Sequence, residues 1–266
     1  MGFLRTIVAA VRADIERPDY LAGLGPRRLP PGGSLRDAVL REGPSGALLA
    51  EYKRRSPGAT HPELPHRGIP EFVDRTSDAR IAAYSCLATG PEFGGSPVDV
   101  AELAARTDRP VLFKDFVVDP VQLDAAARSG ASAVLLIARL EVEGLLSTPL
   151  RLLAKGAHDR GLEVLLEWHG RAELRQTEDV PADVYGVNVR DLDSLEIRRT
   201  VAEETIRAAD ACRPLLGMSG VEGPADARRF WTAGVDGILV GTALSRADDP
   251  MAFLASLGRP VREDRT

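Results

Sequence analysis

Length, composition and charge narrow the function before any motif is considered. The chain has 266 residues, 44% of them hydrophobic and 27% charged, which is typical of one large globular domain or two smaller ones. Its net charge of −5 argues against a general nucleic-acid binder, because affinity for a phosphate backbone comes from clustered Lys and Arg. No apolar run approaches the roughly 20 residues of a membrane span, and there are two cysteines, so we expect a cytoplasmic protein without a disulfide framework.

The first 46 residues predict a helical extension. Residues 3–17 are amphipathic with mixed charge, which indicates a docked helix that ends before Pro18. A link rich in Pro and Gly follows at 23–33, and a second short helix is expected over 35–41. We therefore place an N-terminal extension at 1–46 and one catalytic domain at 47–266.

From residue 47 onward, apolar runs typical of strands alternate with helical patterns. The runs begin near residues 47, 82, 111, 133, 162, 185, 214 and 237, and helical patterns cover 121–129, 147–160, 201–211 and 224–233. This spacing is that of βα units, since parallel strands need crossovers of such length. An open doubly wound sheet would alternate in the same way. Eight units without a Gly-rich nucleotide-binding motif favour the closed α/β fold, a (β/α)8 TIM barrel.

The segment 54–70 after the first run is long and contains four prolines. Long loops without regular structure in compact domains are mostly lids or binding loops, and a surface insertion is the alternative. His61 and His66 lie in this segment, but no Cys or carboxylate stands at metal-ligand spacing from them. No metal site is therefore expected.

Ionisable and amide side chains stand at the ends of four runs. They are Glu51, Lys53, Lys114, Glu167 and Asn188. Strand ends of a parallel barrel share one face, so these groups should converge and perturb each other's pKa values. Two lysines and two carboxylates in one mouth are suited to general acid–base catalysis. The alternative is a ring of ion pairs that only closes the end of the barrel.

Two further strand ends predict a phosphate site. Ser219 and Gly220 end the seventh run, and Gly241 and Thr242 end the eighth. In many barrels the backbone N–H groups after strands seven and eight bind a phosphate. His169, which follows Glu167, is interpreted as structural rather than catalytic. The neighbouring pair Arg54 and Arg55 either steers an anionic substrate or is a solvated loop charge.

These residues give the chain a resemblance to the indole-3-glycerol phosphate synthase family. The similarity extends over nearly the whole length, the N-terminal helical extension included. It rests on the order and spacing of the segments 50–57, 93–96, 111–116, 133–138, 186–192 and 238–241. The resemblance implies ring closure of 1-(2-carboxyphenylamino)-1-deoxyribulose 5-phosphate by condensation, decarboxylation and dehydration. It implies a small phosphorylated substrate, no cofactor, no nucleic-acid or membrane partner, and a monomer or homodimer.

The same resemblance implies roles for individual residues. Lys114 is the general acid on the ketone oxygen, Glu167 stabilises the cationic ring intermediate or acts as base, and Lys53, paired with Glu51, assists loss of the hydroxyl. The sequence leaves open which of the two lysines serves which step. Asn188 and Arg190 hold polar groups of the substrate. The phosphate pocket is assigned to Ser56, Ser219, Gly220, Gly241 and Thr242. The apolar slot for the anthranilate ring is assigned to Phe93, Phe116, Leu135 and Leu239. Leu135 and Leu239 are equally suited to ordinary packing inside the barrel.

Two departures from the family pattern leave alternatives open. Met218 stands where the family has a carboxylate, which should lower the pKa values of the nearby lysines, and the family's lid lysine is absent from the segment after Ser56. A paralogue that acts on a ring-modified anthranilate in a specialised pathway, or a non-catalytic phosphate-binding barrel, is therefore an alternative. A related aminoaldose–ketose isomerase would need a Cys and an Asp at the ends of strands one and six, which this chain lacks.

Overall fold

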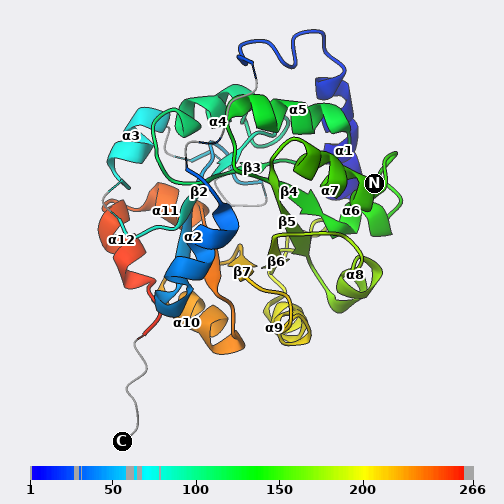
Figure 1. Cartoon of the computed structure of the whole chain (residues 1–266). Coiled ribbons are helices and arrows are strands. Elements are labelled where there is room, and N and C mark those ends of the chain that lie inside the picture. Colours follow the sequence, from blue (N-terminus) through cyan, green and yellow to red (C-terminus); the bar gives the residue numbers. More distant parts are fainter. Residues whose placement is uncertain are drawn as a thin grey trace, which may run out of the picture.

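The sheet of the computed structural model closes on itself, with β1 beside β8 (Figure 1). The structure describes residues 2–26, 30, 32–57, 63–64, 68–77 and 79–260. All neighbouring strands run parallel, in the order β1 to β8. The strands are β1 (Ala47–Tyr52), β2 (Ala83–Leu87), β3 (Val111–Lys114), β4 (Ala133–Ile137), β5 (Glu163–Trp168), β6 (Val184–Asn188), β7 (Leu215–Met218) and β8 (Gly237–Val240). The prediction of a (β/α)8 TIM barrel is thus confirmed.

Helices surround the sheet and occupy the intervals between strands (Figure 1). The predicted helices at 3–17, 35–41, 121–129, 147–160, 201–211 and 224–233 are all present within three residues of the expected bounds. The helices are α1 (Phe3–Ile15), α2 (Leu35–Glu42), α3 (Ile69–Asp74), α4 (Pro97–Ala104), α5 (Pro120–Ser129), α6 (Ala138–Val142), α7 (Leu150–Asp159), α8 (Arg171–Gln176), α9 (Arg199–Ala208), α10 (Pro224–Ala233), α11 (Thr242–Arg246) and α12 (Pro250–Ser256), with a short 3-10 turn at Gly43–Ser45.

Local sequence explains why these helices start and stop where they do. Asp119 accepts a hydrogen bond from the backbone of Val121 and forms a capping box with Gln122, while Pro120 takes the first helical position of α5. The same helix ends at Gly130, whose φ of 78° is left-handed and suits glycine. Local capping therefore fixes where the chain turns back toward the next strand.

The strands are buried on both faces, as parallel strands covered by helices are. Alternate side chains of each strand point into the barrel, where small and branched apolar residues such as Leu49, Leu112 and Leu165 pack together. The side chains between them pack against the surrounding helices. The period of two therefore decides which residue at each strand end faces the interior of the barrel.

Helix α2 covers the end of the barrel where the strands begin. Its buried Leu35, Ala38 and Val39 pack into the inner apolar cluster. The Ser34 hydroxyl donates to Glu163 Oε1 at 2.5 Å, and the backbone N–H of Arg36 donates to Glu163 Oε2 at 3.0 Å. Because Glu163 is the first residue of β5, this contact fixes α2 across the N-terminal ends of the strands.

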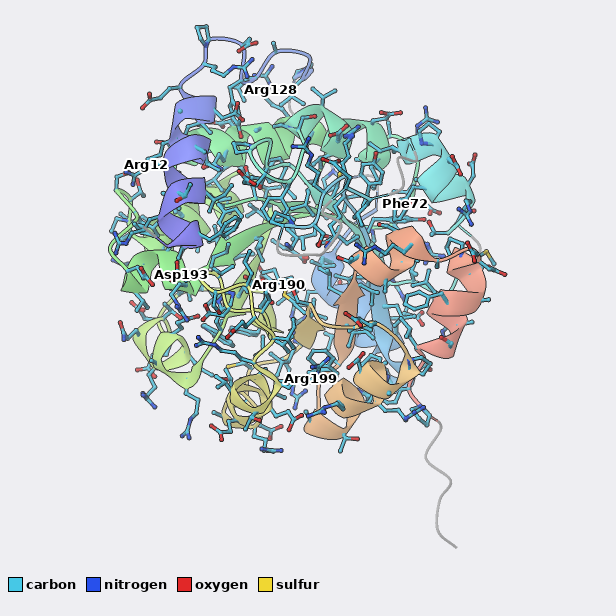
Figure 2. All side chains as sticks on the ribbon, turned by 180° about the vertical axis from the view of Figure 1, so that it is seen from behind. Arg12, Phe72, Arg128, Arg190, Asp193 and Arg199 are labelled. Carbon is cyan, nitrogen blue, oxygen red and sulfur yellow. The ribbon has the colours of Figure 1, made fainter. Side chains whose placement is uncertain are left out.

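Helix α1 instead lies against the loops at the opposite end, where it contacts the segment that follows α6. Arg12 donates to the carbonyl of Leu145 at 2.6 Å, and the backbone N–H of Leu4 donates to Asp193 Oδ1 at 3.3 Å. Figure 2 shows Asp193 beneath the N-terminal end of α1, with Arg190 nearer the middle of the molecule. The extension therefore contributes to the end of the barrel where the strands finish.

In the part of the chain that the structure describes, every helix is too short or too polar to cross a membrane.

Candidate active site

A cavity of about 630 Å³ opens at the C-terminal ends of the strands, a volume suited to a small organic ligand. Every residue that the sequence nominated as catalytic or substrate-binding lines it. These are Glu51, Lys53, Ser56, Phe93, Lys114, Phe116, Leu135, Glu167, Asn188, Arg190, Ser219, Gly220, Leu239, Gly241 and Thr242. The strand ends thus converge on one space, as the barrel topology requires.

Glu51 lies between the two lysines of the cavity. Its Oε1 is 2.8 Å from Nζ of Lys53, and its Oε2 is 3.5 Å from Nζ of Lys114. Burial raises the pKa of Glu51, but the charges of the two lysines and their hydrogen bonds together outweigh burial and hold that pKa below its ordinary value. Burial also lowers the pKa of Lys53, against the opposing effect of Glu51. The result is a compact cationic cluster with one shared carboxylate.

Gly241 leaves the space that this cluster needs. A Cβ atom at residue 241 would overlap Glu51 Oε1 and lie 3.0 Å from Nζ of Lys53. The φ of Gly241 is −128°, so the requirement for glycine comes from the neighbouring side chains and not from a left-handed backbone. The glycine at the end of β8 therefore makes room for the ion pair on β1.

Glu167 and Asn188 face the lysine cluster from the opposite wall, on β5 and β6. Asn188 Nδ2 donates to Glu167 Oε2 at 3.1 Å, and Asn188 Oδ1 accepts the backbone N–H of Arg190 at 3.0 Å. The Arg190 guanidinium donates to the carbonyl of Leu195 at 2.8 Å, and burial lowers its pKa. A carboxylate, an amide and a guanidinium are thus held in order along this wall.

The hydroxyl groups of Ser56 and Thr242 meet at the β1–β8 side of the cavity, with their oxygens 3.0 Å apart. At the end of β7, Ser219 and Gly220 have φ values of 65° and 67°. Both residues line the cavity, so a segment of main chain with two positive φ values borders it there. The sequence-predicted phosphate residues therefore come together from β1, β7 and β8.

The remaining wall is apolar. The rings of Phe93 and Phe116 pack with centroids 6.0 Å apart, and Leu135 and Leu239 are buried while also lining the cavity. The two interpretations of these leucines, ring slot and barrel packing, therefore both describe their position. Further apolar residues that the sequence did not nominate also line the cavity, among them Phe3, Ile137, Leu192, Leu195, Ile197, Val221 and Phe253.

Met218 occupies the floor of the cavity beside Asn188 and Leu239 on the neighbouring strands. Its side chain is buried in the inner apolar cluster. A Cβ atom at Gly186 would lie 2.6 Å from its Sδ, so the thioether fills the space that this glycine leaves. Burial is the first cause of the lowered pKa of Lys53, and the expected effect of Met218 on the lysines stays a prediction.

Arg54 and Arg55 are both engaged in ion pairs. Arg54 donates two hydrogen bonds to the carboxylate of Asp99, at 2.7 and 2.8 Å, and lies over the ring of Tyr52. Arg55 Nε is 2.7 Å from Glu63. Arg54 therefore anchors the start of the segment after β1. Residues 58–62 and 65–67 of that segment, with His61, His66 and the position of the missing lid lysine, lie outside the described residues.

The chain is similar in sequence to known proteins over most of its length. The profile of the family "Indole-3-glycerol phosphate synthase" matches residues 4–257. A relative of that name from Staphylococcus aureus strain JH1 is 36% identical over 224 residues, which cover 83% of this chain and 82% of the relative. The enzyme of the same name from strain USA300 is 34% identical over 221 residues, with the same coverage.

A solved structure shares the fold at greater distance. Thiamine phosphate pyrophosphorylase from Pyrococcus furiosus aligns with 82% of this chain and 95% of its own, with a TM-score of 0.57 and 16% identity. At that identity the likeness concerns the barrel alone. The family profile and the relatives, in contrast, match in sequence over most of the length, and from them it follows that the chain belongs to the indole-3-glycerol phosphate synthase family.

Proposed function

We propose that the cavity binds 1-(2-carboxyphenylamino)-1-deoxyribulose 5-phosphate and closes its indole ring, with release of CO₂ and water. The main support is the placement of two lysines around one carboxylate on one wall, with Glu167 and Asn188 facing them. A proton donor and a carboxylate on opposite sides of one cavity can serve the two ends of a reacting molecule. Family membership supports the same reaction.

The substrate fits the three parts of the cavity by chemical type. Its phosphate is assigned to the polar end formed by Ser56, Thr242 and the backbone at Gly220. Its aromatic ring is assigned to the slot beside Phe93 and Phe116. The carboxylate then falls near the Arg190 guanidinium, which balances its charge until CO₂ leaves.

We assign Lys114 to the first step. Its ammonium lies farther from Glu51 than that of Lys53, 3.5 Å against 2.8 Å, and its side chain is the more exposed of the two. Lys114 donates a proton to the ketone oxygen while the ring carbon that bears the carboxylate forms the new carbon–carbon bond. The negative charge of Glu167 stabilises the cationic ring, and loss of CO₂ returns an electron pair to it.

Lys53 and Glu51 are assigned to the dehydration. Lys53 donates a proton to the departing hydroxyl, which leaves as water, and the neighbouring carbon gives up a proton to Glu51 to complete the indole. The 2.8 Å contact between Lys53 and Glu51 lets one pair serve as acid and base in a single step. The protein is expected to act as a monomer or homodimer in the cytoplasm, which sedimentation and cell fractionation test.

The test is a continuous fluorescence assay for the indole product with purified protein and the unsubstituted substrate. The Lys114→Ala variant should lose about 10²- to 10⁴-fold in kcat, since one general acid contributes that much. Lys155→Ala is the matched control, because Lys155 is exposed on α7 and pairs only at the surface with Asp159. Full activity of Lys114→Ala would refute its assigned role.

Assays of the unmutated protein separate the ring-closing enzyme from the two alternatives, a specialised paralogue and a non-catalytic barrel. If the protein turns over ring-substituted substrates but not the unsubstituted one, it belongs to a specialised pathway. Binding of both substrates without turnover would indicate a non-catalytic barrel. At present neither the cavity nor the relatives favours these alternatives.

A further inference from the structure

A second row of ionisable groups continues from Glu167 outside the residues that line the cavity. His169 Nε2 is 3.4 Å from Glu167 Oε1, and His169 Nδ1 is 3.3 Å from Glu173 Oε2. The other oxygen of Glu173 forms a short ion pair with Nε of Arg139 on α6. The side chains of Glu167, His169 and Glu173 are each at most 3% exposed. These three side chains are therefore enclosed in the protein, and Glu167 is the one among them that lines the catalytic cavity.

Local structure holds the middle of this row in place. Glu173 on α8 accepts the backbone N–H of His169 at 2.6 Å as well as facing its ring. The carbonyl of Glu173 accepts the Thr177 hydroxyl at 2.8 Å, and that hydroxyl accepts the indole N–H of Trp168 at 2.9 Å. The imidazole is thus fixed from its own backbone and from the helix that follows.

The free side of the imidazole points to the catalytic carboxylate. His169 Nε2 is buried and makes no hydrogen bond within the described part of the chain, and Glu167 Oε1 is the charged atom that it faces. A buried nitrogen without a partner is costly, so this contact is the one that can compensate it. Contacts of catalytic groups are often long without substrate and shorten when it binds.

We propose that His169 is a positioning residue for Glu167. Asn188 holds one oxygen of the carboxylate at 3.1 Å, and His169 Nε2, 3.4 Å from the other, forms a hydrogen bond to it when substrate binds and so fixes the carboxylate plane toward the substrate. Glu173 and Arg139 in turn orient the imidazole. This inference rests on the proposed function, because it assigns His169 a task in the chemistry of Glu167.

Two substitutions separate positioning from packing. In His169→Gln the amide nitrogen can occupy the position of the imidazole Nε2. In His169→Asn the shorter side chain brings its amide nitrogen only to the position of Nδ1. We expect His169→Asn to lower kcat about 10- to 100-fold with KM and Tm close to those of the parent, since misplacement of a catalytic group by about 1 Å costs up to this much. His169→Gln should recover most of kcat.

Each outcome decides between the two proposals. Parent-level kcat in His169→Asn, or equal losses in both variants, would overturn the positioning role while the parent's turnover upholds the ring-closing reaction. No turnover by the parent would overturn both. Should His169→Asn fail to fold, Glu173→Gln takes its place, since it keeps an acceptor for the His169 backbone and removes the charge that orients the ring. The same fall in kcat at constant KM is then expected, and an unchanged kcat would refute the proposal.

Discussion

Substitution of Gly241 by Ala is the most direct perturbation of the lysine cluster. The added methyl group overlaps Glu51 Oε1 and lies 3.0 Å from Nζ of Lys53. The backbone at Gly241 is not left-handed, with a φ of −128°, and the close contacts of the added methyl group are with the ion pair. Glu51 cannot swing away freely, because it is buried and contacts both lysines.

The size of the effect follows from the geometry. Glu51 Oε1 must retreat by about 1 Å to reach an ordinary contact, which disturbs its 2.8 Å pairing with Lys53. Overpacking of this kind costs about 1–3 kcal/mol of stability. A displacement of about 1 Å of a catalytic group costs roughly 100-fold in rate, or about 2.7 kcal/mol in activation free energy.

The assay compares kcat/KM and Tm of Gly241→Ala with those of Gly223→Ala. Gly223 precedes α10 with an extended backbone, and its Cβ would meet nothing within 4 Å. We expect the control to resemble the parent and Gly241→Ala to lose roughly 100-fold in kcat/KM while remaining folded. Parent-level kcat/KM in a folded Gly241→Ala variant would show that the Glu51–Lys53 geometry does not limit the reaction.

Two further predictions concern stability. Gly186→Ala should lower the free energy of unfolding by about 1–3 kcal/mol, because its Cβ would lie 2.6 Å from Met218 Sδ. In a double-mutant cycle followed by thermal unfolding, Met218→Ala should restore part of this loss. Additive effects of the two substitutions would contradict the contact. Burial raises the pKa of Glu51, but the two lysines outweigh burial and hold its folded-state pKa below 4.5. Ionisation of Glu51 therefore stabilises the fold above pH 4.5, and this stabilisation is lost as the pH falls through the lowered pKa. The excess stability of the parent over Glu51→Gln in urea unfolding should therefore shrink as the pH drops below 4.5, and a pH-independent difference would refute the pairing.

The strands and longer helices were predictable because their signals are local. The expected strand starts lie within one residue of those in the structure, since each run of apolar residues is bounded by a turn or a cap. Six helices of at most eight residues were not predicted, because about two turns or fewer show little of a helical period; they are α3, α4, α6, α8, α11 and α12. The barrel itself followed from the number and spacing of the units.

The site was predictable only where it lies on strand ends. The alternation of side chains placed Glu51 and Lys53 on one side, and the shared face of a parallel barrel brought Lys114 and Glu167 to them. Phe3 and Phe253 were missed because they belong to helices outside the strand pattern, and an apolar helix position gives no sign of which cavity it lines. The contact between Gly186 and Met218 is likewise a matter of packing across neighbouring strands.

The two anchor points of α1 imply an order of assembly during synthesis. Arg12, near the end of α1, bonds to Leu145, whereas Leu4, at its start, bonds to Asp193, 189 residues farther along the chain. At ribosomal speeds that separation corresponds to a delay of about 10 to 40 s. The Leu145 anchor is therefore available to α1 before the Asp193 anchor, and the part of the cavity wall to which Phe3 belongs is incomplete until β6 has been made.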